Sequence, residues 1–143
     1  MYRESAIEVR LEKETSRRVK INRGVRQGCP ASCTLFNVYI DHIIEKWFTR
    51  NPKGIDIGAN RSLATMLFAD DQIVLAKTED DLQRAVRGLE LIAEEYGMKI
   101  STSKTKVMAF LGKDPVRSKI VIDNKIIEQI NTFKYTWGQR FHT

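Results

Sequence analysis

The sequence predicts an α+β fold in which an antiparallel sheet carries helices on one face. Three observations support this prediction. Short apolar segments occur in pairs around polar turns, some of them alternate apolar with charged residues, and two longer segments have apolar residues at helical spacing. The length of 143 residues and the hydrophobic content of 42% fit one domain with a real core.

A hairpin is expected near the N-terminus. Ile7, Val9 and Leu11 alternate with charged side chains, and Val19 and Ile21 repeat the pattern after a polar turn. A period of two is typical of strands with one buried face. We therefore expect two paired, half-buried strands whose outer face is charged.

A loop and a long helix follow this hairpin. The loop, residues 22–30, contains two glycines and ends at Pro30, which is favoured in the first turn of a helix. The helix is expected over residues 32–48, with a broad apolar face that predicts extensive burial. Residues 51–54 end the helix. The apolar stripe consists of Phe36, Ile40, Ile43 and Trp47, widened by Leu35, Tyr39 and Ile44.

A second hairpin is expected at residues 63–76. Two apolar runs, 63–68 and 73–76, are too short to be separate helices and flank a polar segment that contains Asp70 and Asp71. The simplest interpretation is a pair of strands joined by a tight turn that carries both aspartates.

One more helix and further strands complete the predicted fold. Thr78 and Asp81 have the spacing of a helix capping box, and Gly97 is well placed to end the helix that follows. Residues 106–110 are a strand candidate. The last predicted hairpin consists of residues 120–122 and 125–130 around Asp123-Asn124.

The adjacent carboxylates of Asp70 and Asp71 are the strongest chemical signal. Aspartate is a common turn residue, so a plain solvated turn explains the pair by itself. However, an easy turn needs Gly or Asn beside Asp, and here Ala69 and Gln72 flank the pair. Two carboxylates beside a hydrophobic sheet are costly unless a cation neutralises them, and Mg²⁺ prefers one or two carboxylates with phosphate oxygens. The functional interpretation is therefore a divalent metal site.

Two other segments contain residues suited to phosphates. In residues 23–30, glycines allow close approach of the backbone, arginines bind phosphate through two hydrogen bonds, and Gln27 offers an amide to a sugar or base edge. Residues 97–106 contain three lysines and four hydroxyl side chains, which can bind phosphate or supply a proton. Each segment taken alone is better explained as a plain loop, which joins a strand to a helix at residues 23–30 and is solvated at residues 97–106.

Together, and in this order, these segments resemble the reverse transcriptases of non-LTR, LINE-type retrotransposons. The sequence Phe68-Ala69-Asp70-Asp71 resembles the catalytic motif C of that family. Residues 26–30 and the following helix resemble motif B, residues 96–108 resemble motif D, and residues 133–135 resemble the start of motif E. The resemblance implies the palm of a right-hand polymerase and RNA-directed DNA synthesis.

The resemblance also implies roles for individual residues. Asp70 and Asp71 correspond to two of three aspartates that hold two Mg²⁺ ions, and Lys104 corresponds to a proton donor to pyrophosphate. The implied nucleotide-binding residues are Arg26, Gln27, Gly28 and Phe68. The implied partners are an RNA template, a DNA primer and deoxynucleoside triphosphates.

The sequence departs from the family pattern in several places. The third catalytic aspartate belongs to motif A, which would precede this sequence, and neither Asp41 nor Asp56 has a motif A context. Thr136-Trp137 stands where the family has Leu-Gly. We therefore expect residues 1–143 to be a partial reverse transcriptase domain with palm motifs B to E, without fingers, motif A or thumb, and inactive as an isolated chain.

The charge pattern favours an anionic partner and leaves alternatives open. The net charge is +6, and basic stretches at residues 17–26 and 97–143 flank an acidic centre. The competing interpretations are a non-catalytic nucleic-acid-binding remnant and another metal-dependent palm-like domain, such as a nucleotide cyclase. No apolar run approaches the length of a membrane helix, and Cys29 and Cys33 form no disulfide framework. An intracellular location, in the nucleus or cytoplasm and away from membranes, is expected.

Overall fold

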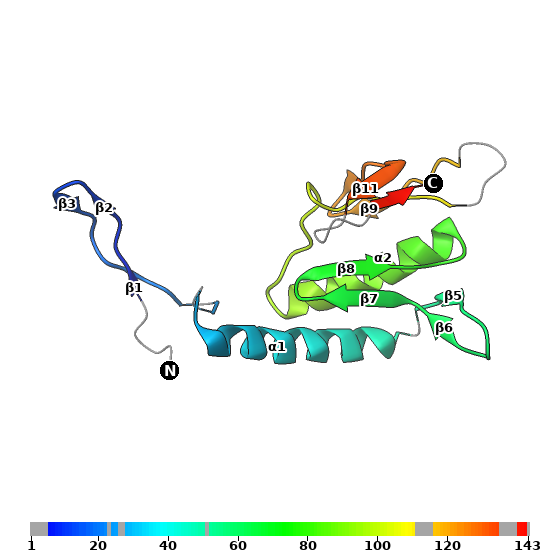
Figure 1. The fold of residues 1–143 in the computed structure, drawn as a ribbon, viewed down its shortest axis with the longest axis horizontal. Coiled ribbons are helices and arrows are strands. Elements are labelled where there is room, and N and C mark those ends of the chain that lie inside the picture. The colour runs from blue at the N-terminus through cyan, green and yellow to red at the C-terminus, as the bar shows by residue number, and fades with distance from the viewer. Residues whose placement is uncertain are drawn as a thin grey trace. The chain divides into compact units, whose positions relative to one another are not determined.

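The computed structural model of the chain describes residues 6–22, 24–25, 28–50, 52–110, 116–134 and 140–142. The chain divides into two compact units, Met1–Ile40 and Asp41–Thr143. The described residues contain two helices and several small sheets, so the structure is mixed α and β (Figure 1). The described strands form six separate two-stranded antiparallel ladders, which differs from the single sheet expected.

The N-terminal hairpin is confirmed, in two short pieces. Between the pieces, the Ser16 backbone N–H donates to the Val9 carbonyl at 2.8 Å, and the Val9 N–H donates to Ser16 Oγ at 3.0 Å. The side-chain hydroxyl therefore replaces one rung of the backbone ladder. The strands are β1 (Ala6–Ile7) paired with β4 (Val19–Lys20), and β2 (Arg10–Leu11) paired with β3 (Glu14–Thr15).

The expected half-burial of this hairpin is wrong. All of its alternating apolar side chains are exposed, and Leu11 at the far end is 76% exposed. A two-stranded ribbon buries little apolar surface unless a third strand or a helix covers it. The period-two pattern therefore predicted the strands correctly. It did not indicate whether another element covers their apolar face. The exposed side chains are Ile7, Val9, Leu11, Val19 and Ile21.

Helix α1 (Pro30–Phe48) begins two residues before the predicted start, with Pro30 in its first turn. The predicted stripe is buried at Ile43 and Trp47, which lie in the second unit. Leu35 and Tyr39, in the first half of the helix, are exposed, so the extensive burial expected for the whole helix is wrong. Helical spacing establishes which residues share a face, but burial also requires an element that packs against that face.

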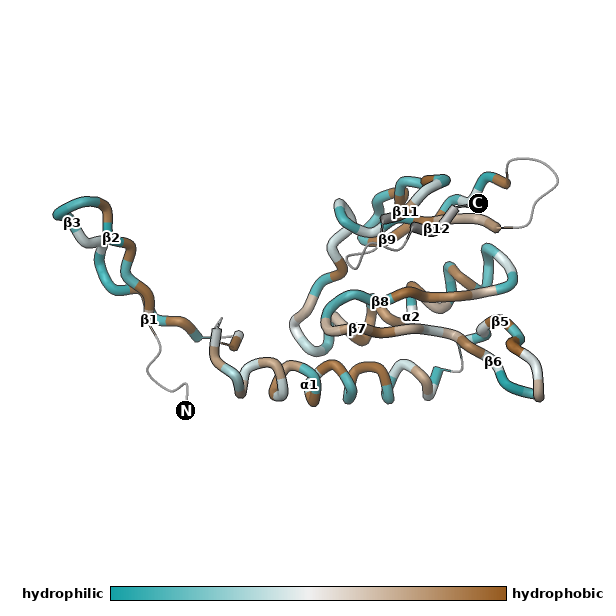
Figure 2. Tube along the Cα trace, viewed as in Figure 1, coloured by the Kyte–Doolittle hydropathy of each residue, from teal (hydrophilic) through white to brown (hydrophobic). Residues whose placement is uncertain are grey.

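The hairpin predicted at residues 63–76 is confirmed as strands β7 (Thr65–Phe68) and β8 (Asp71–Val74). The pairing continues beyond the named strands, because the Leu75 N–H donates to the Ala64 carbonyl at 2.9 Å. A further hairpin, not predicted from the sequence, precedes it and consists of β5 (Ile55–Asp56) and β6 (Ser62–Leu63). Figure 2 shows the hydrophobic character of β8 beside the hydrophilic turn that joins it to β7.

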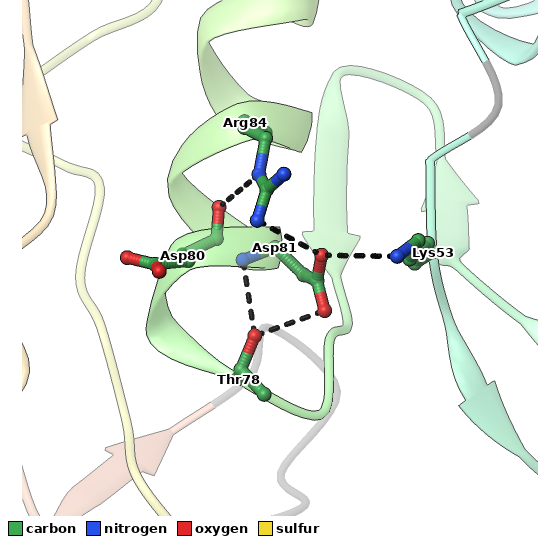
Figure 3. Close-up of polar contacts among 5 residues, drawn as sticks. All are labelled: Lys53, Thr78, Asp80, Asp81 and Arg84. Carbon is green, nitrogen blue, oxygen red and sulfur yellow. Dashed lines mark hydrogen bonds and ion pairs between the residues drawn. The ribbon is translucent and has the colours of Figure 1, made fainter.

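Helix α2 (Glu79–Glu95) begins at the predicted cap. The Thr78 hydroxyl accepts a hydrogen bond from the Asp81 N–H at 3.2 Å and donates to Asp81 Oδ2 at 2.9 Å (Figure 3). The other Asp81 oxygen lies 3.6 Å from Arg84 and 3.9 Å from Lys53. The Thr78 side chain therefore caps a backbone N–H in the first turn of α2, and two cations lie near the Asp81 carboxylate.

The predicted stop of α2 is also confirmed. Gly97 has φ = +68°, and its N–H donates to the Glu94 carbonyl at 2.9 Å, while the Met98 N–H donates to the Ala93 carbonyl at 2.8 Å. This pair of bonds is a Schellman motif, which requires a left-handed residue just past the helix end. Glycine adopts that conformation without the steric cost of a Cβ atom.

The C-terminal region contains the last predicted hairpin but not the predicted strand at 106–110. Val107 forms only an isolated parallel bridge with Gln129. Asp123 and Asn124 have φ values of +49° and +57°, as a two-residue hairpin turn of type I′ requires. The strands are β9 (Val121–Ile122) paired with β10 (Lys125–Ile126), and β11 (Thr132–Lys134) paired with β12 (Arg140–His142). Tyr135 and Thr136-Trp137 lie outside the described residues.

The core of the second unit is built around α2. One face of this helix packs against α1 and Ala64, and another packs against the β9–β10 hairpin and Val107. Val74 of β8 contacts both clusters, so the hairpin that carries the aspartates is anchored in the core. No helix among the described residues has the length and apolar character to cross a membrane. The buried clusters are Ile43, Trp47, Ala64, Ala85, Leu89 and Ile92, and Val86, Val107, Ile120, Ile122 and Ile127.

Candidate active site

The turn between β7 and β8 holds the two predicted aspartates. Phe68 pairs with Asp71 across the hairpin, which leaves Ala69 and Asp70 as the two turn residues. Asp70 therefore occupies the turn itself, and Asp71 begins the return strand. The expectation that both residues lie together at a hairpin tip is confirmed.

The backbone of this turn is strained. Ala69 has φ = +53°, a left-handed conformation that L residues with a Cβ atom rarely adopt. The conformation costs roughly 1–2 kcal/mol, and glycine would remove most of that cost. Ala69 is a poor turn residue by sequence, and its positive φ is the structural consequence. Strain of this kind concentrates at functional sites, where the surrounding structure holds it in place.

The aspartates are open to solvent. Asp70, Asp71 and the neighbouring Phe68 are all exposed, so ligands can reach this turn without rearrangement of the core. Carboxylate oxygens are the preferred ligands of hard divalent cations, and two of them fit a site completed by water and phosphate oxygens. Among the described residues no group of three or more His, Cys, Asp or Glu side chains could hold a metal ion. The turn therefore provides two carboxylates of a donor set rather than a closed metal cage.

Lys104 lies in a separate turn after α2. Its backbone N–H donates to the Ser101 carbonyl at 3.1 Å, and the Thr105 hydroxyl donates to the same carbonyl at 2.8 Å. The side chain of Lys104 is exposed and forms no ion pair with any described residue. The turn thus presents a lysine to solvent, and no described contact joins this lysine to Asp70.

The predicted nucleotide loop belongs to the first unit. Gly28 is exposed and has φ = +80°, and a Cβ atom added there would meet no atom within 4 Å. The backbone conformation, not crowding, is therefore what favours glycine at this position. Arg26 and Gln27, also predicted for this loop, lie outside the described residues.

An ion pair away from the aspartate turn has shifted pKa values. Lys46 of α1 donates a hydrogen bond to the carboxylate of Glu95 at the end of α2. This hydrogen bond raises the pKa of Lys46 and lowers the pKa of Glu95 from their ordinary values. The Lys46 ammonium also lies 5.5 Å from the centre of the Tyr96 ring. These contacts link α2 to the part of α1 that belongs to the second unit.

Sequence reasoning did not single out the cations at the other end of the β7–β8 hairpin. Arg61 and Lys77 line one pocket, although they are far apart in the sequence. A periodicity argument could not have found them, because their proximity depends on the β5–β6 hairpin, which was not predicted. The only sequence signal is that Lys77 directly follows one short apolar run and Arg61 stands two residues before another.

The fold and the turn together define a class of protein. Adjacent exposed carboxylates on a strained hairpin turn, in an α+β chain with a net charge of +6, are typical of proteins that handle phosphate esters with divalent cations. The comparisons name the family. The family described as reverse transcriptase (RNA-dependent DNA polymerase) matches residues 1–136.

Two curated relatives agree with this match. Both are retrovirus-related Pol polyproteins from the type-1 retrotransposable element R2. The protein from Nasonia vitripennis is 31% identical over 111 residues, which cover 78% of this chain. The protein from Popillia japonica is 29% identical over 129 residues, which cover 85% of this chain. The matched region is only 10% and 21% of the length of these relatives.

The chain belongs to the reverse transcriptase family and is of the non-LTR type. The family is described as RNA-dependent DNA polymerase, and it generally uses divalent metals, an RNA template and nucleotide substrates. The resemblance found in the sequence motifs is thus confirmed at the level of the family.

Proposed function

We propose that this chain supplies part of the polymerase site of an RNA-directed DNA polymerase from a non-LTR retrotransposon. The single observation that carries the proposal is the exposed Asp70–Asp71 pair on the β7–β8 turn, inside a region that matches the reverse transcriptase family. We further propose that residues 1–143 correspond to palm motifs B to E. The alternative of a nucleotide cyclase loses its support, because the family match extends over the loop at residues 26–30.

In this proposal Asp70 and Asp71 hold Mg²⁺. Their exposed carboxylates fit the ion as a partial donor set, and a third carboxylate, substrate phosphates and water would complete the coordination. When bound, a pair of Mg²⁺ ions activates the primer hydroxyl and stabilises the leaving pyrophosphate. The contribution of this chain is to place two adjacent negative charges on a turn that the core of the second unit holds in position.

The other predicted residues act on the substrates. Phe68 precedes the turn and offers an exposed aromatic surface beside the primer end. Lys104 is free to donate a proton to pyrophosphate from its exposed turn. Gly28, with Arg26 and Gln27, is proposed to line the pocket for the incoming nucleotide, where a backbone without a Cβ atom permits close approach.

The proposed partners are an RNA template, a DNA primer and deoxynucleoside triphosphates, and the proposed location is intracellular, in the nucleus or cytoplasm. The net charge of +6 suits binding to a polyanion. A second candidate function is a nucleic-acid-binding remnant without catalysis. It is favoured by the observation that the described residues provide no third ligand near the two aspartates.

Primer extension by the purified chain tests the proposal. The assay contains an annealed RNA template with a DNA primer, Mg²⁺ and nucleotides. We expect binding of the template–primer that weakens as salt rises, and no extension, because the chain supplies only one side of a two-metal site. Removing one metal ligand costs several kcal/mol of transition-state stabilisation, and each ~1.4 kcal/mol is a factor of ten in rate.

Two results would contradict this proposal. If the chain does not bind nucleic acid at low salt, it does not act as part of a polymerase. Extension that is lost in Asp70→Ala shows instead that the chain is a complete catalyst, and that an unidentified residue completes the metal site. The control is Asp80→Ala on α2, because Asp80 is an exposed carboxylate in the same unit and outside the turn.

A further inference from the structure

A pocket of about 320 Å³ lies beside the β5–β6 hairpin in the second unit. This hairpin is found at the end of β7–β8 that is remote from the Asp70–Asp71 turn (Figure 1). The pocket is thus separate from the candidate active site. Its lining residues are Gly54, Asp56, Asn60, Arg61, Ser62 and Lys77.

The lining residues come from three chain segments. Asp56 of β5 pairs with Ser62 of β6. The bond from the Leu75 N–H to the Ala64 carbonyl extends the β7–β8 pairing toward β6, and Lys77 follows two residues later. The β5–β6 hairpin and the segment after β8 therefore both contribute side chains to the pocket.

The turn of the β5–β6 hairpin supplies the remaining polar groups. Gly58, Ala59 and Asn60 have φ values of +86°, +52° and +56°, and the Arg61 N–H closes the turn on the Gly58 carbonyl at 3.1 Å. The carboxylate of Asp56 accepts the Gly58 N–H at 2.9 Å. Asp56, the only carboxylate that lines the pocket, thus accepts a hydrogen bond within its own turn.

The balance of charge in the pocket is positive. Arg61 and Lys77 contribute two cations, against the single carboxylate of Asp56. Within the part of the chain that the structure describes, neither cation forms an ion pair, whereas nearby Lys53 lies 3.9 Å from Asp81. The two cations are therefore available to a ligand from solvent.

The chemistry of the lining selects an anion with several acceptor oxygens. A guanidinium, an ammonium, a hydroxyl and an amide all donate hydrogen bonds, and phosphate oxygens accept them. A metal cation is disfavoured, because the two positive charges repel it. We infer that this pocket binds a backbone phosphate of a single-stranded RNA, as a contact distinct from the polymerase site.

The position of the pocket fits a strand that passes the active site. Lys77 lies six residues beyond Asp71, a separation of up to roughly 20 Å along an extended chain. A free nucleotide cannot reach both places, but a polynucleotide can. The inference rests on the proposed function, since it assigns a second contact to the same class of substrate.

The test measures binding of a fluorescently labelled oligouridylate to the full chain at several salt concentrations. The double variant Arg61→Gln/Lys77→Gln removes both pocket cations. The matched control Arg10→Gln/Lys13→Gln removes the same residue types from exposed positions of the β2–β3 hairpin. Asp56→Asn keeps the acceptor oxygen for Gly58 but removes the negative charge. Circular dichroism confirms that each variant is folded.

We expect the double variant to bind more weakly, with a shallower dependence of log affinity on log salt. The slope should fall by roughly 0.7–1 for each phosphate that is no longer neutralised. The control should leave the slope within error of the original chain. Asp56→Asn should tighten binding, because it raises the positive charge of the pocket without removing its turn contact.

Different failures have different meanings. If the original chain binds the oligouridylate and the double variant keeps the same slope, the pocket inference is wrong and the proposed function stands. If the original chain binds no oligouridylate at low salt, both are wrong. Inorganic phosphate alone is a second probe. Phosphate-induced NMR shifts at the pocket, combined with an unchanged oligouridylate slope, would identify a free-phosphate site and overturn the inference.

Discussion

Replacement of Trp47 should destabilise the unit that carries the β7–β8 turn more than any exposed substitution in α1. Trp47 is fully buried, and its indole N–H donates to the Ala85 carbonyl of α2 at 2.8 Å. It belongs to the same cluster that packs against Val74 of β8. Trp47→Ala therefore opens a cavity where the two helices and the hairpin meet.

The magnitude follows from burial. A buried tryptophan removes about 150–250 Å² from water, which at ~25 cal/mol per Å² is worth roughly 4–6 kcal/mol. Measured large-to-small changes of this kind cost about 3–5 kcal/mol. Trp47→Phe keeps most of the apolar contact and loses the hydrogen bond, so it should cost about 1–2 kcal/mol. The Ala85 carbonyl lies inside α2 and keeps its helical partner.

Urea unfolding followed by circular dichroism measures these costs. With an m-value of about 1–3 kcal/mol/M, a loss of 4 kcal/mol lowers the midpoint by roughly 1–4 M. The control is Phe48→Ala, because Phe48 is adjacent in α1 but 49% exposed, and it should cost about 1 kcal/mol or less. Equal costs for Trp47→Ala and Phe48→Ala would refute the packing of α1 on α2 described above.

Two further predictions concern the same helices. Gly88→Ala should raise the free energy of unfolding in urea by about 0.5–1 kcal/mol, because alanine favours the helix more than glycine does. The new Cβ atom would lie 3.4 Å from Arg50 Cδ, which is an ordinary contact. A lower free energy of unfolding would contradict this prediction. The lowered pKa of Glu95 means that its pair with Lys46 stabilises the fold above the unfolded carboxyl pKa. This effect is lost as the pH falls through the lowered, folded pKa of Glu95. Lys46→Met should therefore reduce stability at pH 7 and reduce it progressively less as the pH falls through that range, and an equal reduction at neutral and acid pH would disprove the assignment.

Much of the second unit was predictable, because its elements have local causes. The Thr78 cap, the Gly97 stop and the Asp123-Asn124 turn all depend on a few neighbouring residues whose side chains or backbone preferences are explicit in the sequence. Their hydrogen bonds form within one turn of chain. Local rules therefore placed α2 and the β9–β10 hairpin correctly.

The errors in burial and in the strand predicted at residues 106–110 involve partners that are distant in the sequence. The apolar alternation at Val9 and the helical stripe at Leu35 indicate faces, but both side chains are exposed in the structure. Residues 106–110 have strand-like composition, yet only Val107 finds a partner, Gln129. Which face is covered depends on tertiary packing, and a residue pattern does not contain that information.

The candidate site was predictable in part for a different reason. The Asp70–Asp71 pair is explicit in the sequence as two adjacent carboxylates between apolar runs, and the unsuitable turn residues beside it, Ala69 and Gln72, favoured a functional interpretation. The structure shows a positive φ at Ala69. A violation of a local rule is thus informative at functional positions. Arg61 and Lys77 are 16 positions apart in the sequence, so only the folded structure reveals that they line one pocket.

The most direct test of the central claim is an NMR titration of the isotope-labelled chain with Mn²⁺, a paramagnetic substitute for Mg²⁺. If Asp70 and Asp71 hold the metal, the amides of residues 69–72 broaden first, excess Mg²⁺ reverses the broadening, and Asp70→Asn with Asp71→Asn abolishes it. The acidic first turn of α2, Glu79–Asp81, is a competitor within the same unit. Broadening that begins at that turn, or that survives the double substitution, would contradict the assignment of the metal site to the β7–β8 turn.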